Sequence, residues 1–154
     1  MKNSIIPIEK ILNNIFVIRD EKVILDTDLS ILYNVETRIL KQAVRRNIDR
    51  FPEDFMFELT IEEYQSLRSQ IVILKRGEHS KYNPFAFTEQ GVAMLSSVLK
   101  TKRAVEVNIA IMRAFVQLRK TLESNQKLSQ KLKELEEMTN QRFDKQDKKN
   151  SNYF

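Results

Sequence analysis

The sequence predicts an α+β protein in which a helix-turn-helix unit and small β-hairpins, arranged like a winged helix, precede a helical pair and a long C-terminal helix. Two short amphipathic stretches, 26–33 and 37–50, meet at a tight turn. Runs rich in β-branched and aromatic residues flank this pair, as strands require. No glycine or proline interrupts 102–146, so one helix of roughly 65 Å is expected there.

The first strand signal lies before the helix pair. Two β-branched runs, 15–19 and 22–25, are separated by Asp20 and Glu21, which are compatible with a turn. Apolar runs at this spacing predict a small hairpin.

The ends of the paired helices carry capping signals. Asp26 and Thr27 are N-cap candidates for the first helix, because their side-chain oxygens can accept hydrogen bonds from free backbone donors. Asn34 follows the helix and tolerates the left-handed conformation of a sharp helix exit. Thr37 offers a cap for the second helix, and Pro52 is expected to end it by disfavouring helix in the residue before.

The second helix has a basic face and an apolar face. At roughly 100° per residue, one sector holds Arg38, Lys41, Gln42, Arg45 and Asp49, and the opposite sector holds Ile39, Leu40, Ala43 and Val44. This is the layout of a recognition helix in a DNA major groove. Gln42 is a type of side chain that reads base edges, and Arg46 and Arg50 at the flank are expected to hold phosphates. A solvated basic face remains the alternative from the pattern alone.

The segments after the helix pair predict a wing. The aromatic alternation of 55–59 indicates a strand, and 82–87 indicates a returning strand that carries Pro84 and is therefore expected at a sheet edge. Between them, 71–74 fits either a strand or a helix end, and 75–80 is a polar loop. Cationic side chains there would touch phosphates or the minor groove. They are Lys75, Arg76 and Lys81.

Two further helices are indicated by caps and periodicity. Thr60 with Glu63 has the spacing of a capping box before 61–67. Thr88 is expected to cap a helix through Leu99, and its partner begins near residue 101 or 102.

The C-terminal stretch is expected to form an exposed helix whose last residues, 147–154, fray. Leu118, Leu122 and Asn125 follow one heptad phase, and Leu128, Leu132 and Leu135 follow another, offset by about three residues. Such an offset weakens coiled-coil pairing without preventing it, so a homodimer through this helix remains open.

Composition limits the functional classes. The chain has 154 residues, 42% of them hydrophobic, with a formal net charge of +5, which favours an anionic partner. It has no cysteine, which fits a reducing compartment. No apolar run of ~18 residues and no signal-type N-terminal segment are present, so a cytoplasmic protein without membrane association is expected.

The sequence offers little catalytic chemistry. Its one histidine, His79, lies in a polar loop, and its two glycines cannot build a phosphate-cradling loop. Asp20, Glu21 and Lys22 together with Glu9 would be the one imaginable metal site, but the predicted hairpin turn explains them better. We therefore expect no enzyme activity, no cofactor and no metal.

Several long strings resemble one domain family. They are LDTDLSILY (25–33), VET (35–37), RNIDRFPEDFMFELT (46–60), LRSQ (67–70), AFTEQGVAMLSSVL (86–99) and VNIAIMRAF (107–115). Together they are similar to the ORF-six-N domain, which is related to KilA-N and occurs in phages and in bacterial genomes with phage-derived genes. Members commonly place glycine where this chain has Asn34, and the left-handed geometry accommodates both.

The resemblance spans about residues 10–119 and implies a DNA-binding domain there, of the kind found in phage antirepressor-like or regulatory proteins, with 120–154 left as a C-terminal helical extension. Together with the basic helix, it predicts a transcriptional regulator that binds double-stranded DNA. The second interpretation is an antirepressor or protein-interaction module that binds a repressor protein through the C-terminal helix. Either protein would be non-enzymatic.

Overall fold

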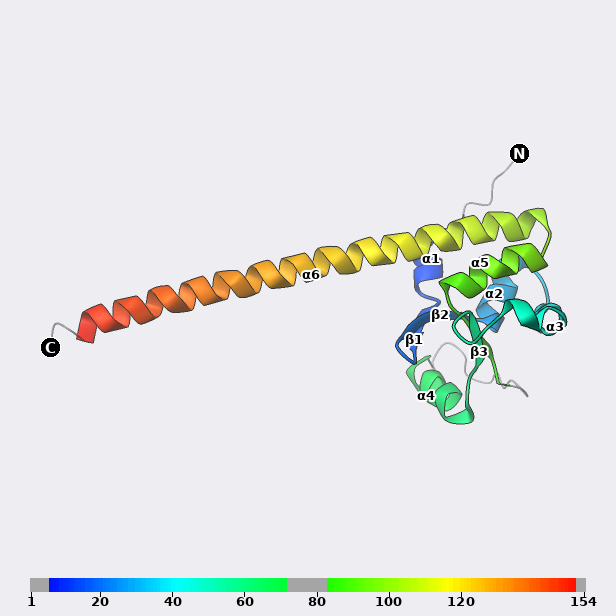
Figure 1. Ribbon diagram of the computed structural model, residues 1–154, viewed down its shortest axis with the longest axis horizontal. Helices are drawn as coiled ribbons and strands as arrows, with labels where there is room; N and C mark the ends of the chain where they lie inside the picture. Colours follow the sequence, from blue (N-terminus) through cyan, green and yellow to red (C-terminus); the bar gives the residue numbers. More distant parts are fainter. Residues whose placement is uncertain (1–5, 72–82, 152–154) are drawn as a thin grey trace. The chain divides into compact units, whose positions relative to one another are not determined.

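The computed structural model describes residues 6–71 and 83–151, and the chain divides into two units, Met1–Phe115 and Val116–Phe154. The predicted mixed α+β class with a long C-terminal helix is confirmed (Figure 1). In chain order, the described elements are α1 (Ile8–Leu12), β1 (Ile15–Ile18), β2 (Glu21–Leu25), α2 (Asp26–Tyr33), α3 (Thr37–Arg46), the 3-10 turn η1 (Ile48–Arg50), β3 (Met56–Glu58), α4 (Ile61–Ile71), β4 (Phe85–Phe87), α5 (Glu89–Val98) and α6 (Lys102–Ser151).

The strands form one antiparallel sheet in the order β1-β2-β4-β3. The expectation that the strand after Pro84 lies at a sheet edge is wrong, because β4 pairs with β2 on one side and β3 on the other. Pro84 stands before β4, so its missing N–H is not needed in the ladder. Its carbonyl instead accepts a hydrogen bond from the Leu59 N–H at 3.0 Å.

The predicted hairpin is confirmed, with its turn one residue earlier than expected. Ile18 pairs with Glu21, which leaves Arg19 and Asp20 as the turn residues. Their φ angles are 55° and 61°. A two-residue turn with positive φ at both positions matches the right-handed twist of the flanking strands, so the left-handed geometry is imposed by the pairing of β1 with β2.

The two faces of the sheet bury different side chains. Ile24 and Phe87 pack into a core with residues of α2, α3, α5 and the start of α6. Their neighbours Val23 and Ala86 face the other way and pack with Leu67 of α4. Figure 1 shows α4 and α5 on opposite sides of the strands. The alternation of side chains along each strand therefore produces two apolar clusters around one sheet.

Two helix starts follow the predicted capping chemistry. The Thr60 N–H donates to Glu63 Oε1 at 2.8 Å, and the Glu63 N–H donates to Thr60 Oγ1 at 3.1 Å, which confirms the capping box. The Thr88 hydroxyl accepts from the Gly91 N–H at 3.3 Å and donates to the Asp54 carbonyl at 2.8 Å. Thr88 thus caps α5 as predicted and ties it to the segment before β3.

Gly91 permits a close approach of α5 to that same segment. A Cβ at this position would lie 1.9 Å from the Phe55 carbonyl oxygen. Only a residue without a side chain fits there, so Gly91 sets how near the helix can come.

The long helix α6 belongs to both units. Within the first unit, Ala104, Val107 and Ile111 are buried in the core beside α5. In the second unit, every side chain described from 119 to 141 is exposed. No helix in the described ranges is both long and apolar enough to cross a membrane.

Candidate nucleic-acid interface

The helix pair α2–α3 is joined by a three-residue turn, 34–36. Asn34 adopts φ 60° and ψ 46°, the left-handed conformation predicted for it. Its N–H donates to Ile31 O at 3.2 Å, and the Val35 N–H donates to Ser30 O at 3.0 Å, which satisfies the last carbonyls of α2. The hydroxyls of Ser30 and Thr37 are also 2.8 Å apart across the turn.

The predicted N-caps of this pair are wrong. Leu25 and Glu36 occupy the cap positions of α2 and α3, and neither makes a side-chain cap hydrogen bond. Asp26 is instead the first residue of α2 and is fully buried. Its Oδ2 accepts from the Phe85 N–H of β4 at 2.9 Å, so the carboxylate joins α2 to the sheet rather than capping its own helix.

Lys41 is the counter-charge of this carboxylate. Lys41 Nζ lies 3.3 Å from Asp26 Oδ2, donates to the Asn83 carbonyl at 2.9 Å, and sits 4.9 Å from the centre of the Phe85 ring. Only 7% of Lys41 is exposed. The prediction that Lys41 lies on the exposed basic face is therefore wrong, because the buried carboxylate draws this ammonium group inward.

Burial dominates the electrostatics of Asp26. Loss of solvation raises the pKa of its carboxyl group, and the Phe85 N–H together with Lys41 acts in the opposite direction. Residue-pattern reasoning missed this contact because it assigned Asp26 to capping. One feature of the sequence does indicate a buried carboxylate. Asp26 directly follows the apolar run 23–25, where a buried strand leads into a helix.

The second helix is shorter than the predicted 37–50. α3 ends at Arg46, and Asn47 takes φ −126° and ψ 35°, outside the helical region. The Asn47 side-chain amide donates to the Ala43 carbonyl at 2.9 Å. Because this side chain satisfies a terminal carbonyl, the helix can stop several residues before Pro52. Arg50 lies in η1, where its Nη1 donates to Ser97 Oγ of α5 at 3.2 Å.

The exposed face of α3 carries three arginines and one glutamine. Arg38, Gln42, Arg45 and Arg46 are all exposed. At roughly 100° per residue they fall within a sector of about 100°. We call these four residues the α3 basic face. Leu40 and Val44 on the opposite side are fully buried, so α3 is held to the core by one face and offers the other to solvent.

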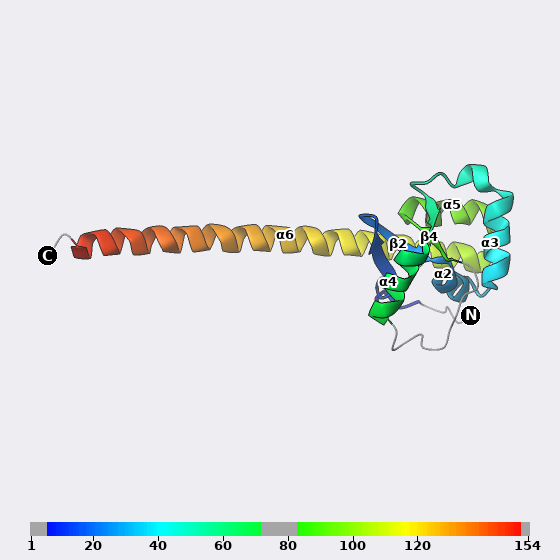
Figure 2. The same ribbon diagram turned by 90° about the horizontal axis from the view of Figure 1, so that it is seen from below.

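Neighbouring residues hold parts of this face in place. The Arg45 guanidinium lies 5.4 Å from the Phe85 ring centre, so Phe85 has Arg45 and Lys41 around it. Arg38 pairs with Glu36 at 3.2 Å, but both side chains are more than 70% exposed, and such a pair exchanges readily with other anions. Figure 2 shows α3 at one side of the first unit, next to one end of α5.

The loop of the predicted wing lies outside the described residues, together with Lys75, Arg76 and Lys81. Ile71, which fitted either a strand or a helix end, is the last residue of α4. Among the residues that are described, no three acidic, histidine or cysteine side chains gather in a way that could hold a metal ion.

A family comparison covers this helix pair and the sheet. The model of the ORF6N domain matches residues 13–98, more than half of the chain. The chain belongs to the ORF6N domain family. The ORF6N match begins just before β1 and ends with α5, so it includes the α3 basic face and the Asp26–Lys41 pair. No curated protein and no solved structure matches the chain. The ORF6N family is phage-related, which is consistent with a DNA-binding or regulatory role.

Proposed function

We propose that this ORF6N protein binds double-stranded DNA by placing the α3 basic face in the major groove, and that it acts in the cytoplasm as a transcriptional regulator of phage-derived type. The observation that carries the proposal is the α3 basic face itself. It gathers three exposed arginines around Gln42 on a helix whose other side is fully packed. A short helix fixed in this way behind a tight turn is the usual geometry of major-groove reading.

The side chains of this face have different proposed roles. Gln42 and Arg38 lie near the middle of the sector, where they would meet base edges. Arg45 and Arg46 lie toward its two sides and Arg50 lies beyond the end of α3, where they would hold phosphates. Lys41 takes no part in DNA contact, and its role is to fix α3 on β4 through Asp26 and Phe85.

The first test removes two phosphate-holding charges. Arg45→Ala with Arg46→Ala is expected to weaken binding to duplex DNA by at least about tenfold, as measured by fluorescence anisotropy at moderate salt. The matched control is Lys10→Ala with Arg113→Ala, which removes the same charge from exposed positions outside the face. An equal loss in both variants would refute the assignment to α3, because general attraction to a cationic protein would then explain binding.

The second test separates base reading from backbone contact. DNA sites are selected from random duplexes with the unchanged protein and with Gln42→Ala. The Gln42→Ala protein is expected to lose preference at one position of the site while keeping the same slope of log affinity against log salt. For the three arginines proposed to hold phosphates, this slope is about −3. A selection that returns no preferred sequence would contradict base reading. Recognition of DNA shape would then be the remaining mode of binding.

A further inference from the structure

The second unit presents apolar side chains that are exposed in the described part of the chain. Leu128, Leu132 and Leu135 are between 50% and 57% exposed, in the stretch 119–141, whose other described side chains are polar except Leu122 and Met138. Helices in water obtain most of their stability from packing an amphipathic face. These leucines are therefore the part of the second unit whose burial would stabilise it.

The spacing of the stripe is that of a continuous heptad repeat. Residues 118, 125 and 132 are seven apart, and so are residues 121, 128 and 135. The first set is Leu118, Asn125 and Leu132, and the second is Thr121, Leu128 and Leu135. Taking Thr121 rather than Leu122 as the core residue removes the phase offset expected from the leucines alone. Three unbroken heptads at 118–138 reach the length at which a coiled coil is favoured.

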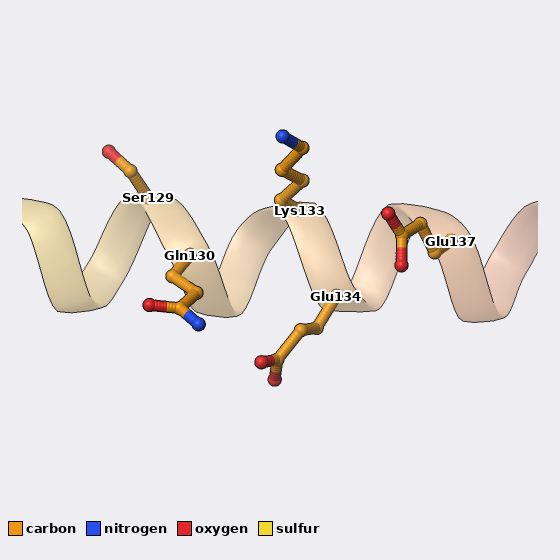
Figure 3. Close-up of a pocket in the computed structure, with 5 residues that line it drawn as sticks. All are labelled: Ser129, Gln130, Lys133, Glu134 and Glu137. Atoms are coloured by element: carbon orange, nitrogen blue, oxygen red, sulfur yellow. The ribbon is translucent and has the colours of Figure 1, made fainter.

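The remaining heptad positions are sorted by polarity. The three positions farthest from the stripe hold charged or amide side chains throughout, at Arg119, Lys120, Glu123, Gln126, Lys127, Gln130, Lys133, Glu134 and Glu137. Figure 3 shows four of these, Gln130, Lys133, Glu134 and Glu137, standing out from the helix together with Ser129. One side of the helix thus stays in water while the other meets a partner.

We propose that the second unit pairs with a second copy of itself as a parallel, in-register, two-stranded coiled coil. The first argument is Asn125, the one polar residue among the three positions of the first set. In a parallel pair it faces its own copy, where the two amides can hydrogen-bond to each other. An asparagine at such a position favours two strands and fixes the register.

The second argument is charge complementarity. The positions that flank the stripe hold Ser124, Lys131 and Met138 on one side and Leu122, Ser129 and Glu136 on the other. In a parallel pair, Lys131 faces Glu136 of the second copy, and this attraction occurs twice. In an antiparallel pair, each side faces its own kind, so Lys131 meets no acid and Glu136 meets no base. The charges therefore select the parallel arrangement.

The decisive measurement is the mass of the full chain by light scattering. The expected value is twice the 18.2 kDa of one chain. Leu128→Glu with Leu135→Glu should return the mass to that of one chain and reduce helix content by circular dichroism. Gln126→Glu with Gln130→Glu adds the same charge to the water-facing side and should leave the dimer intact. Thermal unfolding of the first unit, unchanged in both variants, shows that folding is preserved.

Orientation is tested by cross-linking, since the chain has no cysteine of its own. Thr121→Cys places a thiol in the stripe without removing a leucine and should form a disulfide-linked dimer on oxidation. Glu123→Cys, on the water-facing side, should not. In addition, Lys131→Glu should weaken the dimer, and a second change, Glu136→Lys, should restore it.

The outcomes are distinct for each part of the proposal. A full chain that stays at the mass of one chain overturns it and leaves the stripe to a different protein, such as the repressor of the second interpretation. A trimer, or no cross-link through Thr121→Cys, contradicts the parallel pair. None of these results depends on DNA binding. If the DNA proposal also holds, two copies of α3 would select a site with two symmetric half-sites.

Discussion

In the first unit Leu40 of α3 is fully buried in the core. In the second unit Leu132 of α6 has 54% of its surface exposed. The lysines differ in the same sense. Lys41 is buried against a carboxylate and an aromatic ring, and Lys127 is exposed on a helix surface. The first unit therefore buries Leu40 and Lys41 against its own residues, whereas the leucine stripe of the second unit is exposed and available to a second copy. The predictions below test this contrast.

The largest effect is expected from the buried ion pair. Lys41→Met leaves the Asp26 carboxylate buried without its counter-charge, which should lower the free energy of unfolding by about 4 kcal/mol. Lys127→Met in the second unit should not change it. Chemical denaturation of the first unit, followed by near-ultraviolet circular dichroism, measures both. Equal effects of the two changes would mean that the Lys41–Asp26 pair is not buried in solution.

The pH dependence gives a check on the same pair. Burial raises the pKa of Asp26, and removing Lys41 removes one of the contacts that lower it. A carboxyl group with a raised folded-state pKa favours the folded state at low pH, and this advantage is lost as pH rises through that pKa. The stability of the Lys41→Met variant should therefore be closest to that of the unchanged protein under acidic conditions.

Asp26→Asn added to Lys41→Met keeps an acceptor for the Phe85 N–H and should recover part of the stability.

The next effect compares the two leucines directly. Leu40→Ala should cost about 3 kcal/mol, because it removes a fully buried side chain and leaves a cavity. Leu132→Ala should leave unfolding of the first unit within about 0.5 kcal/mol, but it should shift the mass of the full chain toward one copy at low concentration. A Leu132→Ala protein that destabilises the first unit would show that the two units are not independent.

A smaller effect is expected at the contact between α5 and the segment before β3. Gly91→Ala introduces a Cβ that meets the Phe55 carbonyl, and relief of this overlap should cost about 2 kcal/mol. The neighbouring exposed Gln90 provides the control, since Gln90→Ala adds no contact. Thermal unfolding compares the two, and a stabilising Gly91→Ala would contradict the close approach.

The smallest effect concerns the surface contact of Arg19 with Glu63. Arg19 Nε and Nη2 donate to the two Glu63 carboxylate oxygens at 2.8 and 2.9 Å, and these hydrogen bonds together with Thr60 N–H lower the pKa of Glu63 to about 2. A carboxyl group whose pKa is lowered in the folded state stabilises the fold at pH values above its ordinary pKa. This stabilisation is lost as the pH falls toward the folded-state pKa.

Glu63→Gln should therefore lower the urea midpoint slightly at neutral pH, and the difference from the unchanged protein should vanish as pH falls from about 4.5 toward about 2. Glu134→Gln, an exposed glutamate of the second unit, should show no such pH dependence. A constant difference across this range would mean that the contact with Arg19 does not form in solution.

The sequence predicts turns and helix caps correctly where residues close together in the chain determine them. The hairpin, the left-handed Asn34, the capping box and the Thr88 cap each depend on residues a few positions apart, and each is present. The hairpin turn was displaced by one residue because the β1–β2 register, rather than the turn residues, sets its position. The end of α3 was misplaced because Asn47 stops it before Pro52 can.

The sequence by itself determined that one helix carries a cluster of arginines and that a long helix carries a leucine stripe. Only the tertiary structure decided which cations are exposed and where β4 pairs. Lys41 and Arg45 are one turn apart on α3, and no local pattern distinguishes them. They differ because Asp26, fifteen residues earlier in the chain, is buried beside Lys41, and a buried carboxylate requires a cation. Such a requirement is visible only after the chain has brought α2, α3 and β4 together.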